Sequence, residues 1–319
     1  IIPQEHIDST RLENMLSVCY ERSVRKLRFD SFQDEDGLVI ICTTKGNINL
    51  IEDVGDPRLP LPRLSKFMLQ SFDLGNEPLI ISNACISGLL GIITAARLIR
   101  DGKYDHVMVL GGDVVSEFTL SGFASLHALT EGVCKPYDKN RGGINLGEAA
   151  AGLVLSNDEM IFKGTFDQYV SGASSNDANH ISGPSRNGEG LYRSIERTLE
   201  SASVSPSQVG YLSAHGTGTS FNDEMESIAF ERAELSNAPI NSMKGYFGHT
   251  LGAAGVIETM LGLEGMKRKE LVPSLGYENH GVSRPMNIIQ VKQPPTSDYF
   301  MKSASGFGGC NAAALFKVG

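Results

Sequence analysis

Short apolar runs alternate along the chain with segments in which apolar residues recur at helical spacing. Leu191, Ile195 and Leu199 lie four residues apart, as on one face of a helix, and the segment 256–263 repeats this spacing. The alternation is typical of an α/β fold with a largely buried sheet. We predict strands, in chain order, over residues 38–43, 79–82, 107–110, 150–155, 164–171, 209–213, 239–241, 301–304 and 312–318.

Two further patterns concern the organisation of the chain. Residues 47–73 contain Pro57, Pro60 and Pro62, which predicts an irregular loop between the first two strands. The run 147–155 is loosely similar to the run 309–318, which hints at a duplication. The length of 319 residues suggests about two domains.

Cys85 is the first candidate for chemistry, because it lies where a strand ends and a helix begins. The apolar run 79–81 precedes it, and an almost wholly apolar helical stretch, 89–99, follows it. A thiol at a helix N-terminus meets unpaired backbone N–H groups and the positive end of the helix dipole, so the position predicts a reactive thiolate. A single cysteine is more often a small buried hydrophobe, so its partners decide the interpretation.

Three later blocks supply such partners, each at the end of an element. His215 lies in Ala-His-Gly-Thr-Gly-Thr after a predicted strand. Lys244 precedes His249 by five residues, and Glu258 follows His249 by nine, on a predicted helix. Phe307 lies in Gly-Phe-Gly-Gly before the last strand. The order of the four blocks favours a catalytic site over isolated structural residues.

These blocks, with Lys-Pro-Tyr-Asp at 135–138 and Leu-Gly-Glu at 146–148, resemble the β-ketoacyl-[acyl carrier protein] synthases from about Gly37 to Gly319. The resemblance implies an α/β thiolase-like fold, with two related βαβαβαββ halves in a five-layer arrangement. It implies an N-terminal half, 1–156, that carries the nucleophilic cysteine. The C-terminal half, 157–319, carries the two histidines and the Gly-Phe-Gly-Gly gate. The family's first strand, glycine-rich turn and helix find no match in the opening residues, so we expect them to be missing or not represented.

Composition excludes several other classes. The net charge of −9 and pI near 5.3 argue against nucleic acid as the main partner. No apolar stretch approaches the length of a membrane span, and the opening residues lack a signal peptide's basic region. The five cysteines form no CxxC pair and the seven histidines no metal-binding spacing, so we expect no metal, no cofactor, and a cytoplasmic location.

The resemblance also implies a reaction, a decarboxylative Claisen condensation between an acyl group on Cys85 and a malonyl group on an acyl carrier protein. His215 and His249, neutral and protonated on Nε2, would donate hydrogen bonds to the developing enolate. Lys244 and Glu258 would organise the electrostatics around them. The backbone N–H groups of Cys85 and Phe307 would form the oxyanion hole, and the Phe307 ring would act as a gate.

Several alternatives stay open. The chain could be a catalytically weak partner subunit of the chain-length-factor type, although such subunits usually lack the cysteine that this chain keeps. Cys310 could suggest a degradative thiolase, but the two histidines favour the Cys-His-His synthases. A cysteine hydrolase would need a carboxylate or amide near a histidine, which neither histidine block supplies. We expect a homodimer, with a heterodimer possible, and lean towards a secondary pathway such as polyketide or aryl-polyene synthesis over primary fatty acid synthesis.

Overall fold

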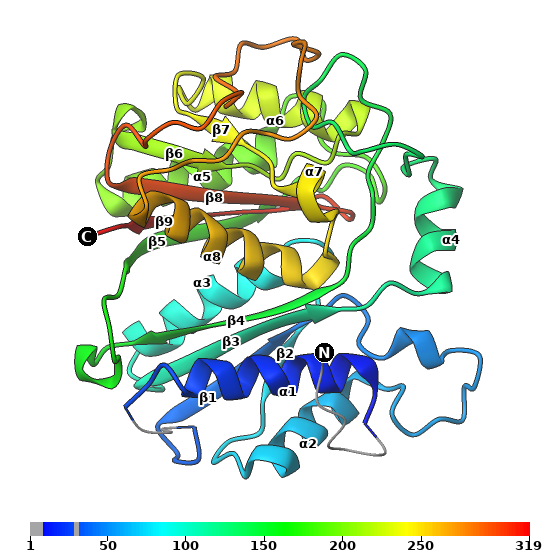
Figure 1. The fold of residues 1–319 in the computed structure, drawn as a ribbon, viewed down its shortest axis with the longest axis vertical. Helices are drawn as coiled ribbons and strands as arrows, with labels where there is room; N and C mark the ends of the chain where they lie inside the picture. Colours follow the sequence, from blue (N-terminus) through cyan, green and yellow to red (C-terminus); the bar gives the residue numbers. More distant parts are fainter. Residues whose placement is uncertain (1–8, 29–31) are drawn as a thin grey trace.

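The computed structural model describes residues 9–28 and 32–319, which form two sheets and three layers of helices (Figure 1). Helices α1 (Arg11–Val24) and α2 (Leu61–Phe72) cover the outer face of the first sheet. Helices α3 (Ser87–Arg100) and α8 (Ala254–Lys267) lie between the sheets, and α5 (Glu189–Ala202) and α6 (Ser220–Arg232) cover the second. The predicted α/β fold with two related halves in five layers is confirmed.

The first sheet has the strand order β2-β1-β3-β4. Its strands are β1 (Gly37–Cys42), β2 (Leu79–Ile81), β3 (His106–Asp113) and β4 (Ala149–Ser156). β1 pairs in parallel with β2 and β3, whereas β4 is antiparallel to β3. β1 and β3 are buried along their whole length, which is why they appear in the sequence as continuous apolar runs.

The second sheet has the order β5-β9-β8-β6-β7. Its strands are β5 (Gln168–Asn176), β6 (Val209–Ser213), β7 (Ile240–Asn241), β8 (Tyr299–Gly306) and β9 (Cys310–Lys317). The nine strands found among the described residues overlap all nine predicted ones. β5 begins four residues later than predicted and extends through Ser174 and Ser175, where small polar residues give no strand signal.

Two expectations about the N-terminal region were wrong. Helix α1 precedes β1, with Thr10 and Glu13 forming a capping box at its start, so the expected absence of a helix there does not hold. The described residues contain no strand before β1. Helix α2 occupies part of the segment predicted as a loop, because Pro60 is its N-cap and Pro62 lies in its first turn, where a missing N–H costs nothing.

Helices α3 and α8 approach each other at glycines, and this contact joins the two halves. A Cβ on Gly255 would lie 2.2 Å from the backbone nitrogen of Leu89. A Cβ on Gly88 would lie 2.8 Å from the carbonyl oxygen of Gly252. Only glycine, whose side chain is a single hydrogen atom, therefore fits at these two positions of the helix crossing.

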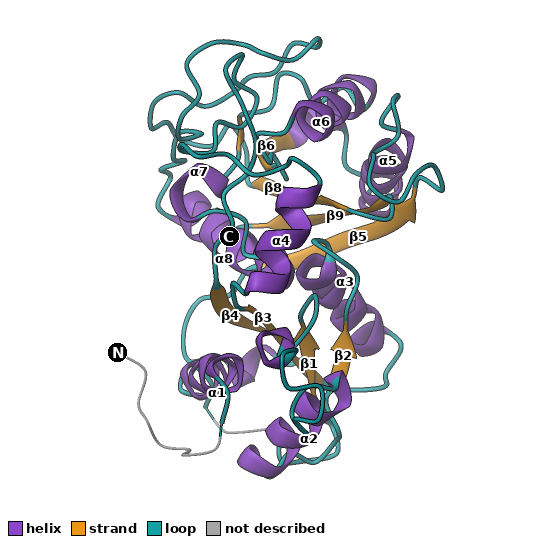
Figure 2. Ribbon diagram, turned by 90° about the vertical axis from the view of Figure 1, so that its right-hand side faces the viewer, coloured by secondary structure: helices purple, strands orange, loops and turns teal. Residues whose placement is uncertain are grey.

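The remaining short helices lie around one end of the two sheets. Helix α4 (Glu117–Ser125) stands at the edge of the molecule, apart from α3 and α8 (Figure 1), and lies in front of the sheets in the turned view (Figure 2). Helix α7 (Lys244–Phe247) and the 3₁₀ turn η4 (Leu251–Ala253) lead into α8. Three more 3₁₀ turns cover Ile48–Leu50, Glu159–Ile161 and Pro206–Gln208. Among the described helices, none combines the length and apolarity needed to cross a membrane.

Candidate active site

Cys85 lies in a tight turn between β2 and α3. Ala84 has a φ of 45°, in the left-handed region that L residues seldom adopt. The Ser87 hydroxyl holds this turn, because its oxygen accepts a hydrogen bond from Asn83 N at 2.8 Å and donates one to Ala84 O at 2.7 Å. The turn places the Cys85 side chain against the central layer with only 7% of its surface exposed.

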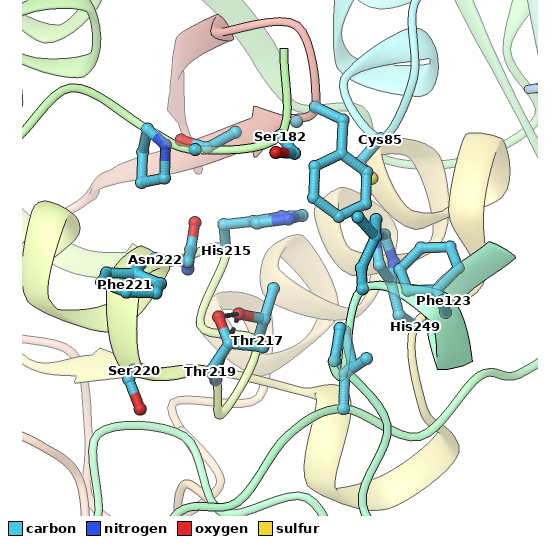
Figure 3. Close-up of a pocket in the computed structure, with 18 of the residues that line it drawn as sticks. Cys85, Phe123, Ser182, His215, Thr217, Thr219, Ser220, Phe221, Asn222 and His249 are labelled. Carbon is cyan, nitrogen blue, oxygen red and sulfur yellow. Dashed lines mark hydrogen bonds between the residues drawn. The ribbon is translucent and has the colours of Figure 1, made fainter. Parts of the chain in front are cut away.

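His215 and His249 face Cys85 across one cavity (Figure 3). One side-chain atom from each of the three residues, the sulfur and a ring nitrogen of each histidine, lies within 4.8 Å of the others. The two imidazole rings meet edge to face with centroids 5.1 Å apart. His215 follows β6 and His249 follows α7, so the site combines a loop of the first half with two of the second.

The hydrogen bonds of His249 define its tautomer. Its Nδ1 accepts a hydrogen bond from the Leu251 backbone N–H at 3.3 Å, so the proton of the neutral ring belongs on Nε2. Nε2 is buried and finds no partner among the described residues. The ring therefore holds an unused N–H donor in the cavity, which a ligand oxygen can accept.

Both histidines are held in the neutral form. The pKa of His249 is lowered to about 3, mainly by burial and then by the positive charge of Lys244, while the negative charge of Glu258 opposes both. Burial, followed by the charge of Lys244, also lowers the pKa of His215 well below its usual value. A neutral imidazole can donate a hydrogen bond without repelling the nearby ammonium groups.

The expectation of a ready thiolate at Cys85 was wrong. The pKa of the Cys85 thiol is raised to about 12, mainly by burial and then by the neighbouring Cys310, while Lys244 acts in the opposite direction. Ile86, the N-cap of α3, makes no side-chain capping bond, and the helix begins only at Ser87. Desolvation therefore outweighs the helix terminus, and the resting thiol is protonated.

Three fully buried charged side chains lie behind the histidines. Lys244 Nζ lies 2.8 Å from Glu258 Oε1 and donates to the carbonyl oxygen of His215 at 2.5 Å. Lys302 Nζ lies 2.8 Å from the other Glu258 oxygen. Although burial raises the pKa of Glu258, the two ammonium groups hold it below its usual value. The carboxylate is therefore ionised between two positive charges.

Lys302 is a site residue that sequence reasoning missed. The signal was present, because a lysine in the apolar strand Phe-Met-Lys-Ser-Ala requires a buried partner. Glu226 was missed as well, and its carboxylate accepts hydrogen bonds from the backbone nitrogens of His215 and Gly216 at 2.8 and 2.7 Å. It fixes the loop that carries His215.

Phe307 lies next to Cys85, as the sequence blocks suggested. Its backbone N–H forms a hydrogen bond with the Cys85 sulfur. A Cβ on the preceding Gly306 would lie 3.1 Å from the Cys85 backbone nitrogen, so the Gly-Phe-Gly-Gly turn lies directly against the turn that carries Cys85. The Phe307 ring packs against Phe123 with centroids 5.6 Å apart and remains 38% exposed.

The cavity in front of these residues measures about 460 Å³. Its walls combine the two histidines and Cys85 with hydroxyl and amide side chains and with apolar side chains of α4 and the following loop, among them Thr217, Thr219, Asn222, Phe123 and Leu126. A second hollow of about 180 Å³, lined mainly by apolar side chains, lies on the other side of Phe123 and Phe307 and also reaches Cys85. Cys85 is thus accessible from both.

The Cys-His-His group could also hold a metal ion by geometry alone. Two buried ammonium groups nearby, on Lys244 and Lys302, oppose a cation at this position. The raised pKa of Cys85 adds to the cost, because a metal-bound thiol must lose its proton. The described residues therefore favour an anionic ligand here over a metal.

Comparison with known proteins gives two matches to family models. The "beta-ketoacyl synthase, N-terminal domain" matches residues 68–161, and the "beta-ketoacyl synthase, C-terminal domain" matches residues 169–278. The two matches meet between β4 and β5. They contain Cys85, Lys244, Glu258 and both histidines.

Curated relatives of this chain are named as 3-oxoacyl-[acyl-carrier-protein] synthases. A putative mitochondrial 3-oxoacyl-[acyl-carrier-protein] synthase of Schizosaccharomyces pombe is 30% identical over 256 residues, which cover 74% of this chain and 60% of the relative. The 3-oxoacyl-[acyl-carrier-protein] synthase 2 of Rhizobium meliloti is 32% identical over 253 residues, with the same coverage. The chain thus spans about 60% of the length of these relatives.

Solved structures extend the likeness to nearly the whole chain. A ketosynthase in complex with its chain length factor from Xenorhabdus doucetiae has a TM-score of 0.83 at 26% identity, covering 98% of this chain and 82% of that one. A beta-ketoacyl synthase from Burkholderia phymatum has a TM-score of 0.88 at 24% identity, covering 97% and 83%. The second likeness concerns the fold alone.

Proposed function

The chain belongs to the β-ketoacyl synthase family, and on that premise we propose that it condenses an acyl thioester on Cys85 with a malonyl group on an acyl carrier protein. One observation carries the proposal. Cys85, His215 and His249 converge within 4.8 Å in a cavity, with both imidazoles held neutral. A nucleophile facing two uncharged donors suits chemistry in which negative charge develops on a thioester oxygen.

In the first step the acyl group moves from the carrier to Cys85. The cysteine sulfur bonds to the acyl carbonyl carbon, the carrier sulfur leaves, and the thiol proton ends on the carrier thiol. Because the pKa of the thiol is about 12, it must lose its proton as the new bond forms; the neutral imidazole of His215, within 4.8 Å of the sulfur, would accept this proton and pass it to the departing carrier sulfur. The N–H groups of Cys85 and Phe307 would stabilise the tetrahedral oxyanion.

In the second step the malonyl group enters the same cavity. Its bond to the carboxylate breaks, carbon dioxide leaves, and the electron pair moves into the thioester as an enolate. The Nε2–H of His249, which has no partner among the described residues, would donate to the enolate oxygen together with His215. The enolate carbon then attacks the Cys85 thioester, whose carbon–sulfur bond breaks. The sulfur leaves as a thiolate, which takes up a proton from solvent to restore the resting thiol, and the elongated chain leaves on the carrier.

The Phe307 ring would act as the gate between the two hollows that meet at Cys85. It packs on Phe123, between the larger cavity and the smaller apolar one. We assign the smaller hollow to the acyl chain, because its lining is mainly apolar, and the larger one to the malonyl carrier arm. Glycines on both sides of Phe307 allow the ring to move.

The proposal includes a dimer. β2 is the outermost strand of the first sheet, and its Leu79 side chain is exposed. Such an edge suits pairing with a second copy or with a related subunit. The five cysteines are free, which supports a reducing compartment such as the cytoplasm. The secondary pathway remains our preferred setting, with a polyketide or aryl-polyene type of product.

A second candidate function is that of a weak partner subunit in a heterodimer. The observation in its favour is the likeness to a ketosynthase found in complex with its chain length factor. The intact Cys-His-His group favours the catalytic subunit. Activity of the chain by itself separates the two.

The test uses acyl and malonyl carrier proteins with wild type and Cys85→Gln. We expect wild type to condense, and the variant to lose condensation while it retains or gains malonyl decarboxylation. His249→Ala should lose both reactions and serves as the matched control. A wild type that neither acylates Cys85 nor decarboxylates malonyl carrier would contradict the proposal and favour the partner subunit.

A further inference from the structure

Lys302 is a fully buried lysine in the middle of β8, behind the site rather than in it. Its Nζ donates to the carbonyl oxygens of Ser213 and Ala214 at 3.1 and 3.2 Å and to that of Ser303 at 2.6 Å. It also lies 2.8 Å from Glu258 Oε2. All its polar contacts therefore lead to Glu258 or to the main chain.

The contacts of the two buried lysines are adjacent. Lys302 binds the carbonyls of Ser213 and Ala214, and Lys244 binds the next carbonyl, that of His215. Two ammonium groups, which share the carboxylate of Glu258, thus hydrogen-bond to three consecutive carbonyls at the end of β6. These hydrogen bonds fix the backbone from which the His215 ring projects.

Such a cluster is expensive to bury. Replacing buried ionic triads with well-packed apolar side chains is often neutral or stabilising, so stability alone does not explain three charges in a core. Burial lowers the pKa of Lys302, and Glu258 opposes this effect; with both lysines protonated, the cluster leaves one net positive charge behind the two histidines. That charge lies where an anion would form in the proposed reaction.

We propose that Lys302 is a positioning residue, which fixes the strand end that carries His215 and supplies the uncompensated positive charge that keeps both imidazoles neutral and favours an enolate. The inference rests on the proposed function and deepens it. Lys302 touches no substrate in this assignment and acts through Glu258, the β6 carbonyls and the field at the rings.

The pH consequence follows from all the charged and titratable groups packed around the two rings. These are Lys244 on α7, Glu258 on α8, Lys302 on β8, Glu226 on α6, Asp113 on β3 and the thiol of Cys85. Lys244 and Lys302 both lower the pKa of each histidine, after the larger effect of burial. Without Lys302, Glu258 would neutralise Lys244, and the pKa of both rings would rise.

The experiment compares wild type with Lys302→Met, which keeps the length and loses the charge. Malonyl carrier decarboxylation is measured in a Cys85→Gln background from pH 5 to 8, so that the acylation step does not interfere. We expect a loss of about ten- to a hundredfold, below that for a direct donor to the enolate. The acid limb should move to higher pH, because each ring is active only when neutral.

A second readout does not depend on activity. The histidine ring carbons, labelled with ¹³C, are titrated by NMR in wild type and variant, and we expect two buried signals to begin titrating at higher pH in Lys302→Met. Met301→Ala, which empties a buried position on the opposite face of β8, is the matched control. It should lower stability without moving either titration.

Lys302→Gln carries the same test should the methionine variant not fold, because it keeps an N–H donor for the Ser213 and Ala214 carbonyls. An unchanged titration in a folded variant would overturn the proposal, and so would failure of both variants to fold, which would make Lys302 a purely structural residue. An inactive wild type with a shifted titration would instead contradict the proposed reaction and leave the electrostatic role of Lys302 supported.

Discussion

In the first sheet β1 lies between parallel β2 and β3, with antiparallel β4 beyond; in the second, β6 lies between parallel β7 and β8, with antiparallel β9 beyond. β4 and β9 contain the two runs whose loose similarity hinted at a duplication. The second sheet has a fifth strand, β5, which pairs with β9, whereas the outer edge of β4 has no strand among the described residues.

The chemistry is divided unequally between these similar halves. The N-terminal half contributes the thiol, and the C-terminal half contributes both imidazoles, both buried ammonium groups and Glu258. The two parts meet where α3 and α8 pack together between the sheets, α8 also contacting β3 and β4, and α3 contacting β5 and β9. The two halves therefore share an arrangement of strands, whereas the side chains at the candidate site differ between them.

The largest effect should come from the charged cluster of the second half. Glu258→Gln leaves two buried ammonium groups without a counter-ion, so the free energy of unfolding should fall by about 3–5 kcal/mol. Urea unfolding measures the change. Glu231→Gln, which removes a partly exposed ion pair with Arg284, is the control and should cost less than about 1 kcal/mol. If both variants lost the same unfolding free energy, the buried cluster would be no more important to stability than a surface ion pair, and the second half would not differ from the first in this respect.

The contact between the halves should be nearly as sensitive. In Gly255→Ala the new Cβ meets the backbone of Leu89 at 2.2 Å, so the helices must separate, at a cost of about 3 kcal/mol. Gly122→Ala in α4, where a Cβ meets nothing within 4 Å, should change stability by less than about 1 kcal/mol. A tolerated Gly255→Ala would show that the halves are not locked at this crossing.

The thiol of the first half should react as a buried neutral group. Because the pKa of Cys85 is about 12, the rate of its alkylation by iodoacetamide should rise about tenfold per pH unit between pH 7 and 10. Peptide mass spectrometry follows Cys85 separately from the other cysteines. A rate that levels off below pH 8 would indicate a thiolate at rest and restore the helix-terminus interpretation.

A smaller effect concerns the imidazoles of the second half. Their pKa values in the folded protein lie below the unfolded value near 6.5, so the unfolded chain binds more protons once the pH falls below that value. Stability from these groups is present above pH 6.5 and is lost as the pH falls towards about 3. Urea midpoints at pH 7 and 5 should therefore differ less in His249→Asn than in wild type, and an equal difference would contradict the assignment.

Much of the fold could be predicted because buried strands leave strong local signals. All nine strands and the helices around Leu191 and Val256 followed from apolar periodicity. Helix α2 was missed because its prolines were taken as breakers, although a proline in the first turn favours a helix start. The Pro60-Leu61-Pro62 sequence contained that information.

The sequence predicted which residues form the site, but it did not predict the protonation states of these residues. The blocks around Cys85, His215 and His249 identified residues that the structure brings into one cavity. The protonation state of Cys85 could not be predicted, because burial depends on segments remote in sequence, among them Gly306 and Phe307. Lys302 did carry a signal, as a lysine within an apolar strand, but its partner Glu258 is 44 positions away on another element, so the sequence did not show what it pairs with.

The glycine crossing of α3 and α8 also limits how the molecule can be recombined. At Gly255 and Gly88 the atoms that a larger side chain would meet are mainly backbone atoms, so no second-site replacement on the opposite helix can make room. A chimaera that takes its first half from one relative and its second half from another must therefore keep glycine at both positions, whichever parents it joins.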